Sequence, residues 1–127
     1  MAMTTDNHLY GWGSNDSGQI GSNFRNLGPK FTPQRSQFKK KIKNFLCGEN
    51  MSLVLTDEGQ LYTVGFNEKF LEITNHPSRC TGYTDTSFFT LVRQLYDMEV
   101  QQISISSDYS YILALTYTNL FGAGNNR

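Results

Sequence analysis

The sequence is poor in the side chains that build metal sites and disulfides. Among its 127 residues are two cysteines, Cys47 and Cys80, and two histidines, and no Cys-x-x-Cys spacing occurs. A structural zinc site takes four such ligands, usually in closely spaced pairs, so this composition argues against one. We expect both cysteines to be reduced, buried thiols, and we expect no metal and no cofactor.

The sequence also lacks an excess of charge of either sign and any long apolar run. Eleven basic residues balance eleven acidic ones, so no overall field attracts the chain to nucleic acid or to an anionic membrane. Residues 1–7 lack the basic start and apolar centre of a signal peptide, and no apolar segment approaches the roughly 18 residues of a membrane span. These absences predict a cytoplasmic or nuclear protein that binds no membrane, and they argue against a nucleic-acid partner.

What the sequence does contain is many aromatic residues and an internal repeat. Nine Phe and seven Tyr help to bring the aromatic content to 13%, and aromatic side chains favour pleated sheets over helices. Residues 9–13 (LYGWG) recur as residues 61–65 (LYTVG) and 120–124 (LFGAG), with starts 52 and 59 residues apart. Repeats with a period near 50 residues are typical of solenoids, propellers and arrays. We predict an all-β chain.

Apolar residues bounded by turn-forming residues predict short strands along most of the chain. Residues 14–32 are rich in Asn, Asp and Gly, and we expect them to be irregular. Residues 88–95 are ambiguous, because their apolar residues have helical spacing while the repeat places a strand at 90–93. We prefer the strand and keep a helix of one or two turns as the alternative. The predicted strands are residues 8–13, 32–35, 42–47, 51–56, 60–65, 90–93, 100–106, 111–116 and 120–124.

The predicted strands group into repeating units. These are unit one, residues 8–59; unit two, residues 60–118; and the start of unit three, residues 119–127. Residues 51–56 align with residues 111–116, so that Leu53 corresponds to Leu113. Each full unit offers four short strands, and four-stranded repeats are the blades of a β-propeller. The chain is therefore predicted to be a partial propeller of about two four-stranded blades plus one strand.

Two segments carry a resemblance to a known family: residues 9–21 (LYGWGSNDSGQIG) and residues 47–59 (CGENMSLVLTDEG). They resemble the RCC1-type repeat (regulator of chromosome condensation), whose copies read as a strand, Trp-Gly-x-Asn and Gly-Gln-Leu-Gly, and later Ala-Gly-x-x-His-Ser-x-Ala-Leu-Thr. Unit two departs more, since it lacks Gly-Gln-Leu-Gly and has Tyr111 in place of the histidine, which Met51 replaces in unit one. The resemblance implies RCC1-type propeller blades. The structural repeat positions that we assign are Gly11, Trp12, Gly13, Asn15, Gly18, Gly21, Gly48, Gly65, Asn67, Gly122, Gly124 and Asn126.

A closed propeller of this type is similar to a seven-bladed ring, and this chain supplies about two blades. Two blades alone would leave sheet faces uncovered and strand edges unpaired. We therefore expect the chain to be a piece of a longer one, or to assemble with another protein or with other copies of itself, two to four of them closing a ring.

One run of charge is a candidate binding patch. Lys39, Lys40, Lys41 and Lys43 precede and enter a predicted strand. Lysines in such a place commonly keep strand edges from pairing with other chains, and that structural role is our preferred interpretation. The functional alternative is a small basic patch that binds an acidic protein surface or a phosphate backbone.

No catalytic site is predicted. The glycine-rich residues 11–18 have the composition of a phosphate-binding loop, but no helix follows them and the repeat explains their glycines. His8 and His76 have no neighbouring carboxylate or nucleophile in the sequence, so no triad can be assembled. Trp12 is expected to pack between blades, and anchoring of a partner is the alternative.

These observations favour a protein-protein interaction or scaffold module that is not an enzyme. The resemblance implies an alternative, a guanine-nucleotide exchange factor, or a fragment of one, for a Ran-type small GTPase. Such a factor releases the nucleotide by inserting protein loops and needs no covalent chemistry, and no residue of this chain can be assigned to that role. The partners expected are proteins, including other copies of the chain, and under the alternative a small GTPase.

Overall fold

The computed structural model describes residues 1–22, 28–65, 88–106 and 111–124. Within these residues the chain forms short strands and one 3-10 turn, η2 (Arg93–Leu95). The prediction of an all-β chain is confirmed. The strands are β1 (Ala2–Met3), β2 (Leu9–Gly13), β3 (Lys30–Arg35), β4 (Ile42–Cys47), β5 (Met51–Thr56), β6 (Leu61–Gly65), β7 (Thr90–Leu91), β8 (Gln102–Ile105), β9 (Tyr111–Leu115) and β10 (Leu120–Gly124).

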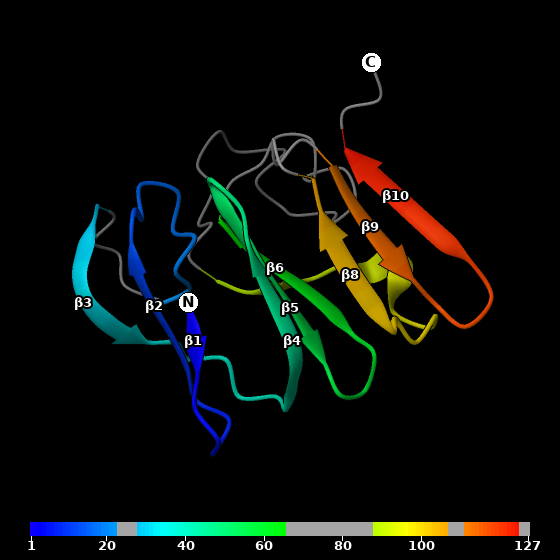
Figure 1. Ribbon diagram of the computed structural model, residues 1–127, viewed down its shortest axis with the longest axis horizontal. Coiled ribbons are helices and arrows are strands. Elements are labelled where there is room, and N and C mark those ends of the chain that lie inside the picture. Colours follow the sequence, from blue (N-terminus) through cyan, green and yellow to red (C-terminus); the bar gives the residue numbers. More distant parts are fainter. Residues whose placement is uncertain (23–27, 66–87, 107–110, 125–127) are drawn as a thin grey trace.

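The strands form three antiparallel sheets that lie in a row (Figure 1). The first sheet has the order β1-β2-β3, the middle sheet β4-β5-β6-β7, and the last sheet β10-β9-β8. In Figure 1 the row begins with the blue and cyan strands at the left and ends with the orange and red strands at the right. Neighbouring sheets therefore follow one another in the order of the chain, as blades of a propeller do.

The sheets are offset from the sequence units. The middle sheet takes β4 and β5 from unit one and β6 and β7 from unit two. A tight hairpin joins the two halves, because β5 pairs with β6 from Met51 opposite Gly65 to Leu55 opposite Leu61. The boundary between units one and two thus falls inside a sheet, so neither unit can form the middle sheet alone.

The core lies on both faces of the middle sheet. All six residues of β5 are buried. Leu53 and Leu55 belong to one buried apolar cluster with Ile112 of the last sheet, whereas Val54 belongs to another with Leu9 of the first sheet. Because side chains alternate along a strand, β5 contributes to the packing between both pairs of neighbouring sheets. Burial of a leucine side chain contributes about 1.5–3 kcal/mol, so β5 is the main anchor of the three-sheet row.

The ambiguous segment contains both elements that the sequence suggested. β7 pairs with β6, and the amide of Val92 extends this ladder by donating to the carbonyl of Leu61 at 2.8 Å. The turn η2 follows directly. Val92 and Leu95 are both buried, so a short strand followed by one turn places both apolar side chains in the core. A longer strand would have pointed them to opposite faces.

The expectation that Cys47 is a buried thiol is wrong. Cys47 ends β4 and is exposed. The reason is that, among the described strands, β4 is an edge strand that pairs with β5 alone, and several of its side chains face solvent. Cys80 lies outside the described residues. The sequence also gave no indication of β1, and β3 begins at Lys30, two residues earlier than expected.

Candidate protein-interaction surfaces

Two of the repeat glycines, Gly11 and Gly65, lie where chain segments come too close together for a side chain. A Cβ added to Gly11 would lie 2.7 Å from the carbonyl oxygen of Ile20. Gly65 has a φ of +94°, and a Cβ there would overlap the carbonyl oxygen of Asn50. These contacts support the structural role proposed for the repeat positions. The others in the described part are Gly13, Gly18, Gly21 and Gly48 in or beside turns, and Gly122 and Gly124 on β10. Asn67 and Asn126 lie outside it.

Buried polar side chains hold the loop after β2 against the middle sheet. Asn15 is 1% exposed, and its Oδ1 accepts a hydrogen bond from the amide of Ile20 at 3.3 Å. Gln19 is also buried, and its Nε2 donates to the carbonyl of Glu49 at 3.1 Å. The carbonyl of Gln19 accepts from the Ser52 hydroxyl at 2.8 Å. Asn15 is one of the predicted repeat positions, whereas Gln19 is not, although its place in the Gly-Gln-Ile-Gly run could have indicated it.

Within the part of the chain that the structure describes, Trp12 does not pack between two sheets, contrary to the prediction. Its side chain is 46% exposed, and Phe31 on the neighbouring strand β3 is 91% exposed. Leu9 and Gly11 are buried, so the alternation of β2 turns Trp12 to the opposite face. The first sheet stands at one end of the row, and no sheet of the described residues covers that outer face.

The lysine-rich segment is partly neutralised by the hairpin between β5 and β6. Lys40 Nζ lies 3.5 Å from the carboxylate of Glu58 and 5.9 Å from the centre of the Tyr62 ring. Lys41 Nζ lies 3.2 Å from the carboxylate of Asp57. Removal of Lys40 from water acts to lower its pKa, but Tyr62 and Glu58 outweigh this effect and raise the pKa above its ordinary value. The raised pKa favours the protonated, positively charged form of Lys40, which lies beside an aromatic ring.

The other two lysines point to different parts of the surface. Lys43 lies on β4 and donates to Gln101 Oε1, just before the last sheet, at 3.4 Å. Lys39 is exposed in the segment between β3 and β4 and lines two surface hollows. The four lysines thus do not act as one uniform patch. Lys39 and Lys40 border the same hollow, whereas Lys41 and Lys43 contact other elements.

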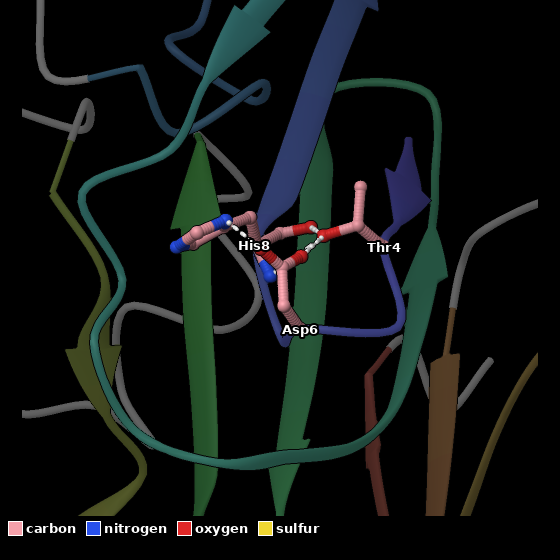
Figure 2. A network of polar contacts seen from close by, with 3 residues as sticks. All are labelled: Thr4, Asp6 and His8. Atoms are coloured by element: carbon pink, nitrogen blue, oxygen red, sulfur yellow. Dashed lines mark hydrogen bonds and ion pairs between the residues drawn. The ribbon is translucent and has the colours of Figure 1, made fainter.

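Thr4, Asp6 and His8 form a polar network at the turn between β1 and β2 (Figure 2). Thr4 Oγ1 donates to Asp6 Oδ1 at 2.5 Å, and Asp6 Oδ2 lies 3.1 Å from His8 Nδ1. The hydrogen bond from Thr4, assisted by His8, holds the pKa of the Asp6 carboxyl below its ordinary value. The prediction that His8 has no neighbouring carboxylate is wrong, because the turn brings Asp6 back against it. The network stabilises the turn.

The same turn ties the first sheet to the middle sheet. Asn7 has a φ of 68° and contacts the chain around the start of β4. Its Oδ1 accepts from the amide of Ile42 at 2.8 Å, and its Nδ2 donates to the carbonyl of Lys40 at 3.0 Å. One side chain thereby satisfies a donor and an acceptor on the segment that carries the lysines, which fixes the position of that segment.

The last sheet has one covered face and one open face. On β9, Ile112 and Ala114 are buried toward the middle sheet, in the same cluster as Leu53. The side chains that alternate with them are 36–45% exposed, and Leu120, which pairs with Leu115, is 63% exposed. We call this surface the open apolar face; it comprises Tyr111, Leu113, Leu115 and Leu120.

Comparison of the two repeat units shows that the open apolar face lacks a covering sheet. Leu113 corresponds to Leu53 in the alignment of the two units. Leu53 is fully buried between the middle and last sheets, whereas Leu113 is 36% exposed. Equivalent positions are thus covered by a following sheet in one case and open to solvent in the other. The open apolar face has the residues of a sheet-packing surface.

The described residues contain no cluster of three or more His, Cys, Asp or Glu side chains that could hold a metal ion. A search of the same residues finds no helix with the length and apolar character needed to cross a bilayer. Two surfaces of the described residues are candidates for function: the open apolar face and the hollow bordered by Lys39 and Lys40.

Comparison with known proteins finds a repeat family whose model matches part of this chain. Residues 6–55 match the model of the Regulator of chromosome condensation (RCC1) repeat. The X-linked retinitis pigmentosa GTPase regulator of Homo sapiens is 34% identical over 112 residues, which are 87% of this chain and 10% of that protein. The secretion-regulating guanine nucleotide exchange factor of Bos taurus is 31% identical over 118 residues, or 88% of this chain and 23% of that protein.

Solved structures show the same fold. Prp20p from Saccharomyces cerevisiae, whose binding to Gsp1p and histones has been described, superposes with a TM-score of 0.77 at 23% identity. The match covers 97% of this chain and 30% of Prp20p. Human WBSCR16 superposes with a TM-score of 0.71 at 15% identity, over 96% of this chain and 29% of that protein. The chain thus spans between 10% and 30% of the length of these four proteins.

Proposed function

Because the chain is built of RCC1-like repeats folded as part of a β-propeller, we propose that it is a protein-protein interaction or scaffold module that works within a larger propeller or assembly. The observation that carries this proposal is the open apolar face, whose Leu113 is equivalent to the buried Leu53. A further β-sheet is the natural partner for this face, because the equivalent face of the middle sheet, which carries Leu53, is covered by the last sheet. Under this proposal the chain acts by binding and catalyses no covalent reaction.

The energetic argument rests on the apolar side chains at this surface. Soluble proteins rarely expose connected apolar patches of large area, and such patches commonly mark interaction sites. Covering a leucine side chain fully contributes about 1.5–3 kcal/mol, and the open apolar face presents three partly exposed leucines and a tyrosine on neighbouring strands. Flat packing of another sheet would cover all four together. In an assembly this sheet could come from another section of a propeller or from another protein. For the chain in isolation only a second copy can cover the open apolar face, so the isolated chain is expected to self-associate.

Sedimentation of the chain over a range of concentrations tests the proposal. We expect association above the 14.5 kDa of a single chain, and we expect Leu113→Asp to abolish it by placing a charge at the centre of the open apolar face. Tyr96→Asp is the matched control, because Tyr96 is 51% exposed and follows η2, outside the sheet. A well-folded monomer at all concentrations, or equal effects of the two substitutions, would contradict the proposal.

The second candidate is exchange-factor activity toward a Ran-type small GTPase. The relatives favour it, since one is a guanine nucleotide exchange factor, one is a GTPase regulator, and Prp20p has been studied with Gsp1p. This chain would then supply one part of a GTPase-binding ring. Release of labelled nucleotide from a panel of small GTPases distinguishes the two: a scaffold module leaves the release rate unchanged, whereas an exchange factor raises it. A cytoplasmic or nuclear location, in keeping with either candidate, stays a prediction.

A further inference from the structure

A hollow lined by aromatic rings lies between the β3-to-β4 segment and the middle sheet. Its volume is about 340 Å³, within the range of about 300–1,000 Å³ that is usual for ligand sites. Phe38 stands at its centre, with its ring centroid 5.1 Å from that of Tyr62 and 4.9 Å from that of Phe89. All three rings are partly exposed. We call this site the Phe38 hollow and define it by Phe38, Lys39, Lys40, Tyr62 and Phe89.

The rim of the Phe38 hollow is positively charged. Lys40 is held over the Tyr62 ring, and Lys39 is exposed beside it. Lys39 also lines an adjoining hollow of about 430 Å³, together with His8 and Arg35. None of the described residues that line either hollow is acidic. Cationic side chains thus border an aromatic surface, although the whole chain has no net charge.

We propose that the Phe38 hollow binds an acidic peptide segment of a partner protein that carries an aromatic side chain. The aromatic side chain would pack against the Phe38 and Tyr62 rings, since aromatic pairs gain energy in edge-to-face and offset geometries. Flanking carboxylates would lie near Lys39 on one side and Arg35 on the other. The two hollows share Lys39 and Phe38, which allows one extended segment to contact both.

The charge distribution favours a peptide over nucleic acid. Binding a phosphate backbone relies on a broad positive field, whereas here Glu58 and Asp57 neutralise part of the lysine run. The site is also separate from the open apolar face, because it is built by β6, the residues just before β7 and the segment before β4 rather than by the last sheet. The two proposals can therefore fail independently.

The test uses the whole chain and a nine-residue peptide with one phenylalanine between aspartates, carrying a fluorescent label. Anisotropy gives the affinity, and amide NMR maps the contact to residues 37–40 and 62. We expect Lys39→Glu to weaken binding about tenfold at low salt, because it replaces an attractive contact with a repulsive one. Lys43→Glu makes the same charge change outside the hollow and should alter affinity less than twofold. Serine in place of the peptide's phenylalanine should also weaken binding about tenfold.

Several results would overturn the proposal. Equal weakening by Lys39→Glu and Lys43→Glu would show that only the overall charge matters. Equal binding of the serine peptide, or of a peptide with asparagines in place of its aspartates, would remove the aromatic or the acidic requirement. Tighter binding of a single-stranded thymidine oligonucleotide would assign the site to nucleic acid. Phe38→Leu keeps an apolar side chain at the site, and its amide spectrum separates loss of binding from loss of folding.

Discussion

The clearest consequence of the three-sheet arrangement is that equivalent leucines should differ in their contribution to stability. Leu53→Ala removes a side chain that is 0% exposed and packed between two sheets. Such truncations leave a cavity and cost about 3 kcal/mol. Leu113→Ala alters a side chain that is already 36% exposed on the open apolar face, so part of the transfer energy was never gained. We expect a cost of about 1 kcal/mol there.

Urea denaturation at low micromolar protein measures both changes in the free energy of unfolding. Low concentration is needed because association stabilises the folded state by mass action, which would add to the apparent cost of Leu113→Ala. The expected difference between the two variants is about 2 kcal/mol, derived from the two costs above. Equal costs at low concentration would refute the reasoning, since they would mean that Leu113 is covered within a single chain.

Three further predictions concern a repeat glycine, the loop after β2, and the turn between β1 and β2. Gly65→Ala should cost about 2 kcal/mol or more, because the residue has a positive φ and an added Cβ would overlap the carbonyl of Asn50. Gly122→Ala is its control in the same denaturation measurement, since its nearest new contact would be an ordinary 3.5 Å. Gln19→Ala should cost about 1–2 kcal/mol, because the Glu49 carbonyl loses its buried donor, and protease digestion should then cut the 14–22 loop faster. Thr4→Val should raise the Asp6 pKa toward its ordinary value in an NMR titration, because the hydrogen bond that lowers it is lost. The stability that this lowered pKa contributes is present above the ordinary carboxyl pKa and is lost as pH falls through the folded value, so an unchanged pKa would contradict the assignment.

Most strands could be predicted from the sequence because local patterns determine them. The runs around residues 42–47 and 51–56 are apolar and separated by Gly48 and Asn50, and the structure has strands with those bounds. The repeat also located β6 and β10 through their shared Leu-aromatic start. Hairpin pairing follows directly from such spacing, because short turns leave the neighbouring strands few alternatives.

The assignment of strands to sheets could not be read from the repeat alone. A repeat defines a period but not the point at which one sheet ends and the next begins. The middle sheet draws on both units because the β5-to-β6 connection is tight, with the Gly59 amide donating to the Thr56 carbonyl at 3.0 Å. The longer segment between β3 and β4 instead crosses from one sheet to the next.

The sequence also could not predict which side chains are exposed. Trp12 and Cys47 have side chains that are commonly buried, and both are exposed because of their place in the row and at a sheet edge. The lysines can be recognised as a run in the sequence. Which of them pair with Asp57 and Glu58, and which line the Phe38 hollow, depends on the fold. The Phe38 hollow joins residues from distant segments, and no local pattern brings them together.

The most direct test of the account is to find which leucines change when the chain associates. Methyl NMR spectra recorded from low micromolar to millimolar protein report this position by position. We predict that the signals of Leu113, Leu115 and Leu120 shift or broaden with concentration, while those of Leu9 and Leu61, buried in the core, stay unchanged. Spectra that are independent of concentration, or changes that avoid the open apolar face, would contradict the proposal that this face binds another sheet.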